Sequence, residues 1–128
     1  MSGPGTFMWN ELCTTDTDKA KGFFAEVVGW QTREMDMGEA GSYTIFQSDG
    51  KDVGGMLKME GEHWAGIPPH WMAYIHVADV DAAVGTATRL GGAVKMPPRD
   101  IPGVGRISWI ADPTGAVVAL MTPEAKAE

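Results

Sequence analysis

The feature that most constrains the fold is an internal repeat, in which the second half of the chain resembles the first at an offset of 63 residues. Asp16 and Asp18 return as Asp79 and Asp81, in the same order relative to the glycines that follow. One copy holds roughly fifty residues, and a chain of that size buries too little surface to be stable alone. The two copies are therefore expected to pack together in a single domain of 128 residues.

Each copy has the same predicted order of elements, β-α-β-β-β. Short runs rich in aromatic and β-branched residues predict strands, and Asp16 and Asp79 are placed as the N-caps of the helices. Gly29 and the pair Gly91 and Gly92 are expected to end those helices. The predicted strands cover residues 7–14, 31–35, 43–47 and 53–59 in the first copy, and 71–77, 93–96, 106–111 and 116–121 in the second.

These elements predict an α+β fold. Two tandem units are expected to form one curved, eight-stranded mixed sheet around a cleft, with the helices outside. The first unit is expected at about 6–59 and the second at about 70–122, joined by a linker over 60–69 that contains glycine and proline. Residues 97–105 are expected to form a loop, with Arg99 and Asp100 either at the mouth of the cleft or on a solvated surface.

Composition narrows the class of protein. The formal net charge is -7 and the only cysteine is Cys13, so a phosphate-binding surface, an intrachain disulfide and a cysteine-based zinc finger are not expected. The longest apolar stretch, 116–121, is too short to cross a membrane, and the first residues do not form a secretory signal. We therefore expect a cytoplasmic protein with no nucleic-acid or membrane partner, and a buried, inert thiol at Cys13.

With these motifs the chain resembles the vicinal oxygen chelate superfamily, the glyoxalase/bleomycin-resistance/extradiol-dioxygenase fold. The similarity runs from about residue 6 to residue 122 and implies a homodimer that binds a small-molecule ligand. The segments that carry it are 16–24, 28–30, 77–83, 90–92 and 112–115.

The resemblance also implies where a metal would be held. Members that use a divalent metal place His, Glu or Gln side chains on the first and last strand of each unit. The matching positions here are Trp9, Met72, Ala119 and, with an uncertainty of one residue, Gly54. None of these offers the carboxylate oxygen or imidazole nitrogen that such a cation needs. We therefore expect no metal and no other cofactor.

Side-chain alternation on two central strands predicts which residues face the cleft. Apolar walls with a few convergent polar groups are typical of small-molecule pockets. Each polar member also has a structural explanation, because a strand carboxylate, a histidine or a tyrosine can be a hydrogen-bonded core residue. The predicted ligand-binding residues are Trp9, Glu11, Met72, Tyr74, His76 and Met121.

Three functions remain open. The favoured one is a small-molecule-binding protein of the glyoxalase/bleomycin-resistance type that takes an aromatic or polar organic ligand without the usual metal. The second is a lyase, isomerase or dioxygenase-type enzyme, in which Glu11 and His76 are catalytic residues or ligands of a displaced divalent metal. Even with Cys13 as a third ligand, that set of metal ligands would be incomplete. The third is a structural or interaction module with no ligand.

Overall fold

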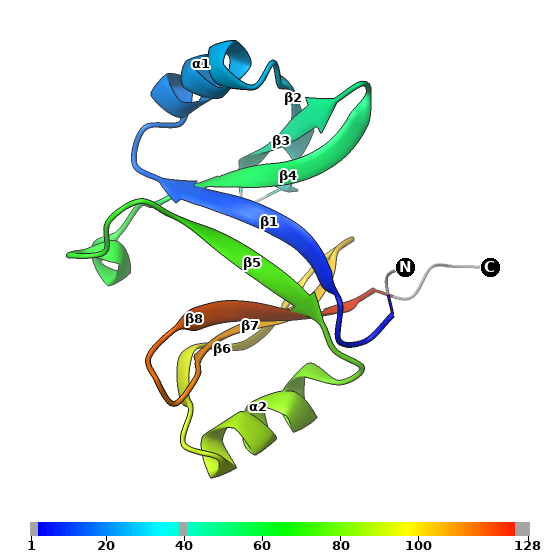
Figure 1. Cartoon of the computed structure of the whole chain (residues 1–128), viewed down its shortest axis with the longest axis vertical. Coiled ribbons are helices and arrows are strands. Elements are labelled where there is room, and N and C mark those ends of the chain that lie inside the picture. Colours follow the sequence, from blue (N-terminus) through cyan, green and yellow to red (C-terminus); the bar gives the residue numbers. More distant parts are fainter. Residues whose placement is uncertain (1–2, 39–40, 125–128) are drawn as a thin grey trace. The chain divides into compact units, whose positions relative to one another are not determined.

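The computed structural model describes residues 3–38 and 41–124 (Figure 1). One strand, one helix and three further strands follow one another twice along the chain, as the repeat predicts. The first set is β1 (Phe7–Thr14), α1 (Thr17–Val27), β2 (Gln31–Asp36), β3 (Ser42–Ser48) and β4 (Lys51–Lys58). After the 3-10 helix η2 (Glu62–Trp64), the second set is β5 (His70–His76), α2 (Val80–Arg89), β6 (Ala93–Ile101), β7 (Gly105–Ala111) and β8 (Val117–Pro123).

The strands form an eight-stranded mixed sheet in the order β2-β3-β4-β1-β5-β8-β7-β6. The β1–β4 and β5–β8 pairs are parallel, whereas β2–β3, β3–β4, β6–β7 and β7–β8 are antiparallel. The predicted α+β class, with two helices and a mixed sheet, is confirmed.

The chain divides into two compact units. One, here the Trp9 unit, is the continuous stretch Trp9–Met72. The other, here the Ala73 unit, joins the described residues up to Met8 with the described residues from Ala73 onward. The predicted repeat boundaries, with a linker at 60–69, stay a prediction, and η2 lies within that stretch.

The two helices begin at the residues that the sequence predicts. The Asp16 carboxylate accepts a hydrogen bond from the Lys19 backbone N–H at 3.0 Å, and the Asp79 carboxylate accepts one from the Ala82 backbone N–H at 3.1 Å. An N-cap of this kind satisfies a backbone donor that has no partner inside the helix. After α1, Gly29 has a φ of +75°, the left-handed conformation that lets the chain turn away toward β2.

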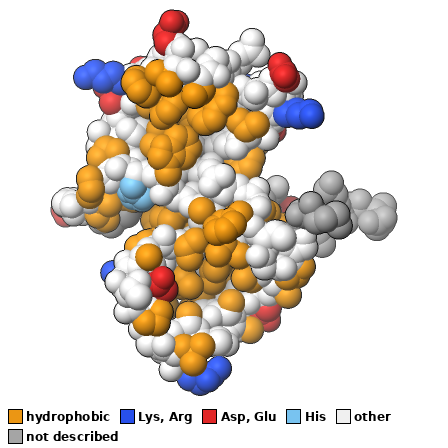
Figure 2. Space-filling view, viewed as in Figure 1, with side chains coloured by type: hydrophobic (Ala, Val, Ile, Leu, Met, Phe, Trp, Pro, Cys, Tyr) orange, Lys and Arg blue, Asp and Glu red, His pale blue; other side chains and the backbone are white. Residues whose placement is uncertain are grey.

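The core of the Trp9 unit is largely aromatic. Leu12, Phe46 and Met56 are buried together, with Phe24 and Trp30 packed against them. Leu12 therefore packs against α1, and Trp30, the residue before β2, is part of the core of this unit. Neighbouring apolar side chains reach the surface (Figure 2), since Phe23, Val27 and Trp71 remain exposed.

The Ala73 unit contains the main departure from the predicted elements. Residues 97–105 were expected to form a loop, but β6 continues through Pro97 and Pro98 to Ile101. Proline is tolerated there because β6 is the edge strand, so a missing N–H leaves no central ladder bond unmade. The strand is irregular at this point, and the buried Ser108 hydroxyl donates to the Met96 carbonyl at 2.6 Å.

Neither α-helix, nor any other helix among the described residues, has the length and apolar character needed to cross a membrane.

Candidate functional site

A chain of hydrogen bonds in the Trp9 unit links two predicted ligand-binding residues through a third residue. The Trp9 indole Nε1–H donates to the Tyr43 hydroxyl at 3.1 Å, and the Tyr43 hydroxyl donates to Glu11 Oε2 at 2.7 Å. Trp9 and Glu11 come from β1, whereas Tyr43 comes from β3. Glu11 is only 6% exposed, so its carboxylate depends on protein groups for much of its solvation.

Gly55 provides the space that Tyr43 occupies. Gly55 is the partner of Glu11 across the β1–β4 pair, and Ile45 is the partner of Gly55 across β3–β4. Tyr43 lies two residues before Ile45 on the same face of β3, so its ring reaches diagonally toward Gly55. A Cβ built on Gly55 would overlap the Tyr43 hydroxyl and ring. The phenol can therefore reach Glu11 only because residue 55 has no side chain.

The Cβ position of the neighbouring Gly54 lies on the opposite face of β4. A Cβ on Gly54 would lie 2.9 Å from the backbone oxygen of Asn10, against the strand and not against Tyr43. The sequence left the family position on this strand uncertain by one residue. Of the two glycines, Gly55 shares a face with Glu11.

Cys13 is the third residue that the sequence places on this side of β1. It is fully buried, and burial, followed by the charge of Glu11, raises the pKa of its thiol to about 12. A thiol with so high a pKa stays protonated at neutral pH, which makes it a weak nucleophile. The expected burial of Cys13 is confirmed, and the inertness of its thiol stays a prediction.

The Ala73 unit brings together three other predicted residues. Tyr74 and His76 lie on β5, and His76 is the partner of Met121 across the parallel β5–β8 pair. Tyr74 and Met121 are buried, while His76 is half-buried. The Trp109 indole N–H donates to the Tyr74 hydroxyl at 3.4 Å. An indole–phenol contact therefore occurs in each unit, between the first and third strands of its set.

The predicted ligand-binding residues thus lie in two groups. Trp9 and Glu11 are joined through Tyr43 in the Trp9 unit, which also contains the buried Met72. Tyr74, His76 and Met121 are grouped in the Ala73 unit. That all six line one pocket stays a prediction.

Sequence reasoning missed Tyr43 and Gly55. One signal was available, because two consecutive glycines inside a predicted strand indicate a bulge or the close approach of another group. The identity of that group was not readable, since it depends on the register of β3 against β4.

The positions where metal-using relatives hold a cation do not fit one here. Trp9 offers an indole N–H, Met72 a soft thioether and Ala119 a methyl group, while Gly54 has no side chain. Divalent cations in such sites need imidazole nitrogen or carboxylate oxygen. Among residues 3–38 and 41–124, no three His, Cys, Asp or Glu side chains form a group that could hold a metal ion.

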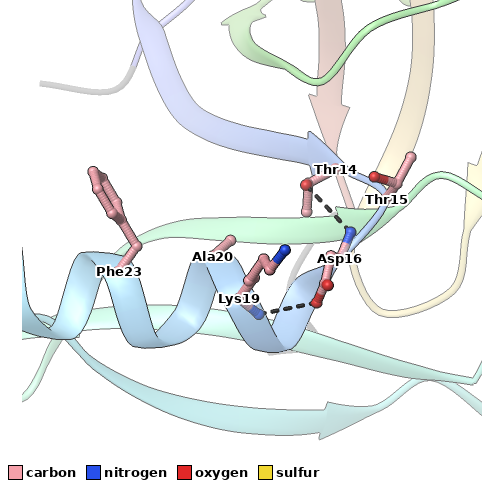
Figure 3. Close-up of a pocket in the computed structure, with 6 residues that line it drawn as sticks. All are labelled: Thr14, Thr15, Asp16, Lys19, Ala20 and Phe23. Atoms are coloured by element: carbon pink, nitrogen blue, oxygen red, sulfur yellow. Dashed lines mark hydrogen bonds between the residues drawn. The ribbon is translucent and has the colours of Figure 1, made fainter.

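The surface of the Trp9 unit has an open hollow of about 510 Å³ at the start of α1. Figure 3 shows the Asp16 carboxylate turned toward the backbone nitrogen of Lys19, and the Thr14 hydroxyl turned toward the backbone nitrogen of Asp16. These polar groups cap the helix. The lining residues are Thr14, Thr15, Asp16, Lys19, Ala20 and Phe23, none of which the sequence predicts to bind ligand.

A smaller hollow of about 230 Å³ lies beside Arg106 in the Ala73 unit. The Arg106 guanidinium donates to Asp81 at 2.8 Å and to Asp100 at 3.0 Å. Asp100 therefore belongs to a surface ion-pair network, the solvated alternative that the sequence left open for it.

Comparison with known proteins identifies the family. The Glyoxalase/Bleomycin resistance protein/Dioxygenase superfamily matches residues 6–120. CFP32, a proposed glyoxylase of Mycobacterium tuberculosis, is 36% identical over 119 residues, which are 93% of this chain and 44% of that protein. The anthracycline biosynthesis protein DnrV of Streptomyces peucetius is 32% identical over an alignment of 128 positions. That alignment covers 91% of this chain and 46% of that protein. The chain thus spans less than half the length of these curated relatives.

Solved structures share the fold at low identity. A methylmalonyl-CoA epimerase of Streptomyces coelicolor, in complex with 2-nitronate-propionyl-CoA, has a TM-score of 0.67 at 20% identity, covering 96% of this chain and all of that one, 100%. The hypothetical protein BH1468 of Bacillus halodurans has a TM-score of 0.70 at 9% identity, covering 98% and 99%. These likenesses concern the fold alone. With the family match over nearly its whole length, the chain belongs to the Glyoxalase/Bleomycin resistance protein/Dioxygenase superfamily.

Proposed function

We propose that this protein binds a small organic ligand with an aromatic part, and that Glu11 is the polar anchor of the site. The observation that carries the proposal is the Trp9–Tyr43–Glu11 network, in which a carboxylate that is 6% exposed is oriented by a phenol and an indole. Small-molecule sites combine apolar and aromatic walls with a few oriented polar groups. The Trp9 unit supplies both kinds of group around one strand.

The relatives support an aromatic ligand. DnrV is named as an anthracycline biosynthesis protein, and anthracyclines are fused aromatic ring systems. The indole of Trp9 offers such rings a stacking surface beside the carboxylate. We keep Met72, Tyr74, His76 and Met121 as proposed ligand-binding residues, without a metal. We also keep the homodimeric state and the cytoplasmic location as proposals.

A thermal-shift screen of aromatic and polycyclic compounds tests the proposal. We expect hits that raise the melting temperature of the wild-type protein and fail to raise that of Glu11→Gln, which keeps the size of the side chain and removes its charge. Glu34→Gln is the matched control, because Glu34 is also a strand glutamate held by hydroxyl groups, those of Ser42 and Thr44. A screen with no hit would leave the interaction-module alternative as the better explanation. Hits that Glu11→Gln retains would place the site elsewhere.

The same network favours a second candidate function, proton transfer at a carbon next to a carbonyl group. A buried carboxylate that is positioned by a phenol is suited to act as a general base. Incubation with methylmalonyl-CoA in deuterated water tests this function by NMR. Deuterium incorporation by the wild-type protein, lost in Glu11→Gln and kept in Glu34→Gln, would support it. No incorporation above the uncatalysed rate would exclude this substrate.

A further inference from the structure

One side of α1 carries a row of side chains that the fold leaves uncovered. This row, here the α1 stripe, comprises Lys19, Ala20, Phe23, Glu26 and Val27. Phe23 and Val27 are 58% and 60% exposed, and none of the 11 described residues of α1 is buried. The Phe23 ring packs edge-on against the Phe24 ring, with 5.1 Å between their centroids. Phe23 is thus an aromatic ring that the core fixes at the surface, and such rings anchor protein interfaces.

Two opposite charges flank Phe23 on the α1 stripe. Lys19 comes four residues before Phe23 and Glu26 three residues after it, so all three lie on one side of the helix. Figure 3 shows Lys19, Ala20 and Phe23 projecting from the same side of α1. Lys19 and Glu26 are exposed, and neither belongs to an ion pair among the described residues. Both charges are therefore accessible to a partner.

These charges make the α1 stripe complementary to itself. When a twofold axis relates two antiparallel helices, a residue before the axis on one helix faces a residue after it on the other. With the axis at Phe23, Lys19 lies about 6 Å and Glu26 about 4.5 Å from it along the helix, and the two differ by only about 20° around the helix. Lys19 of one copy therefore faces Glu26 of the second copy, and the symmetry makes this contact twice.

The other flank of the α1 stripe fits by size. Ala20 and Val27 are also seven residues apart, and they lie on the side of Phe23 away from Lys19. The same axis therefore sets Val27 of one copy over Ala20 of the second. Ala20 and Phe23 line the open hollow of about 510 Å³ at the start of α1 (Figure 3). The larger side chain thus meets the position where space remains.

From this geometry we infer that the α1 stripe is the surface through which a second copy of this chain binds, with the two α1 helices antiparallel. The inference rests on the homodimeric state proposed above, since it names the surface that forms that dimer. One helix pair buries less than the roughly 800 Å² per partner of a standard interface, so the dimer is reversible and its population depends on concentration.

Sedimentation equilibrium of the full chain measures this association. Over a range of about 1 µM to about 1 mM, we expect a dissociation constant in the micromolar range. Phe23→Ser should raise the dissociation constant at least about tenfold, because it removes the central apolar contact. Far-UV circular dichroism checks that the variant is folded.

Charge reversal tests the pairing itself. Lys19→Glu sets like charges against each other in both pairs, and so does Glu26→Lys, so each variant alone should raise the dissociation constant about tenfold. An equimolar mixture of the two variants should recover the wild-type association, because both pairs in the mixed dimer again join opposite charges. Asp18→Lys is the matched control. Asp18 lies on the opposite side of α1 from Phe23, so this reversal should leave the dissociation constant within about twofold.

The outcomes separate the surface from the oligomeric state. If the wild type stays monomeric up to about 1 mM, the proposed homodimer is wrong, and the inference with it. If Phe23→Ser and both charge variants dimerise as well as the wild type, the dimer exists but uses another surface. If the mixture associates no better than each charge variant alone, or if Asp18→Lys weakens the dimer as much as Lys19→Glu does, the antiparallel pairing is wrong.

Discussion

Replacing Gly55 with alanine would place a methyl group where the ring and hydroxyl of Tyr43 now lie, because all three nearest atoms to a Cβ at this position belong to the Tyr43 side chain. The ring would have to leave, and its hydrogen bonds to Trp9 and Glu11 would be lost. A neutral hydrogen bond contributes about 1 kcal/mol and one to a charged group about 1.5–3 kcal/mol. Displaced side chains in a packed interior add about 1–3 kcal/mol.

We therefore expect Gly55→Ala to lower the free energy of unfolding by about 3.5–7 kcal/mol, measured by urea denaturation. Gly22→Ala is the control, because Gly22 lies in α1 with open space around it. The same chemical change there should raise the free energy of unfolding by about 0.5–1 kcal/mol, since alanine loses less conformational freedom in a helix than glycine does.

A double-mutant cycle isolates the contact. In a Tyr43→Ala background the ring is absent, so Gly55→Ala should cost less than about 1 kcal/mol, and the two substitutions should couple by about 2 kcal/mol or more. The reasoning would be refuted if Gly55→Ala stayed within about 0.5 kcal/mol of the wild type, or if the costs of the two substitutions simply added.

Three further predictions concern stability and reactivity. Asp16→Ala and Asp79→Ala should each lower the free energy of unfolding by about 1 kcal/mol, and Asp16→Asn by much less, because asparagine also caps helices. The Cys13 thiol, its pKa raised to about 12 by burial and by Glu11, should resist Ellman's reagent until urea unfolds the chain; rapid reaction in the native state would contradict this. Hydrogen bonds from the hydroxyl and backbone of Thr114 and from the Ala116 backbone hold the pKa of Asp112 below its ordinary value. The stability that this contributes is present above the pKa of the unfolded chain and is lost as the pH falls through the lower folded value. The urea midpoint of the wild type should therefore fall more on acidification than that of Asp112→Asn, and equal falls would argue against the linkage.

The fold could be predicted where local chemistry determines the structure. Asp16 and Asp79 cap their helices because a carboxylate before a run of helix formers has backbone donors within reach, whatever the rest of the chain does. The extension of β6 through Pro97 and Pro98 could not be predicted in the same way. Proline argues against a strand unless that strand is at an edge, and edge position is a property of the whole sheet.

The candidate site could be predicted only in part, for a related reason. Alternation along β1 places Trp9 and Glu11 on one face, so their proximity follows from the sequence. Tyr43 is more than thirty residues away from Glu11, and its contact depends on the register between β3 and β4. That register shifts between Phe46 and Gln47, so counting residues back from the hairpin would have placed the ring opposite the wrong partner.

The fit of Tyr43 over Gly55 also has a consequence for how this sequence can change over generations. Neither position can be altered freely while the other stays as it is: a side chain at 55 displaces the phenol, and loss of the phenol leaves a void above the glycine. A lineage leading from this chain to one with a metal-binding side chain at residue 55 would have to lose the tyrosine first. The two positions should therefore vary together among descendants, with a large residue at 43 only where residue 55 is glycine.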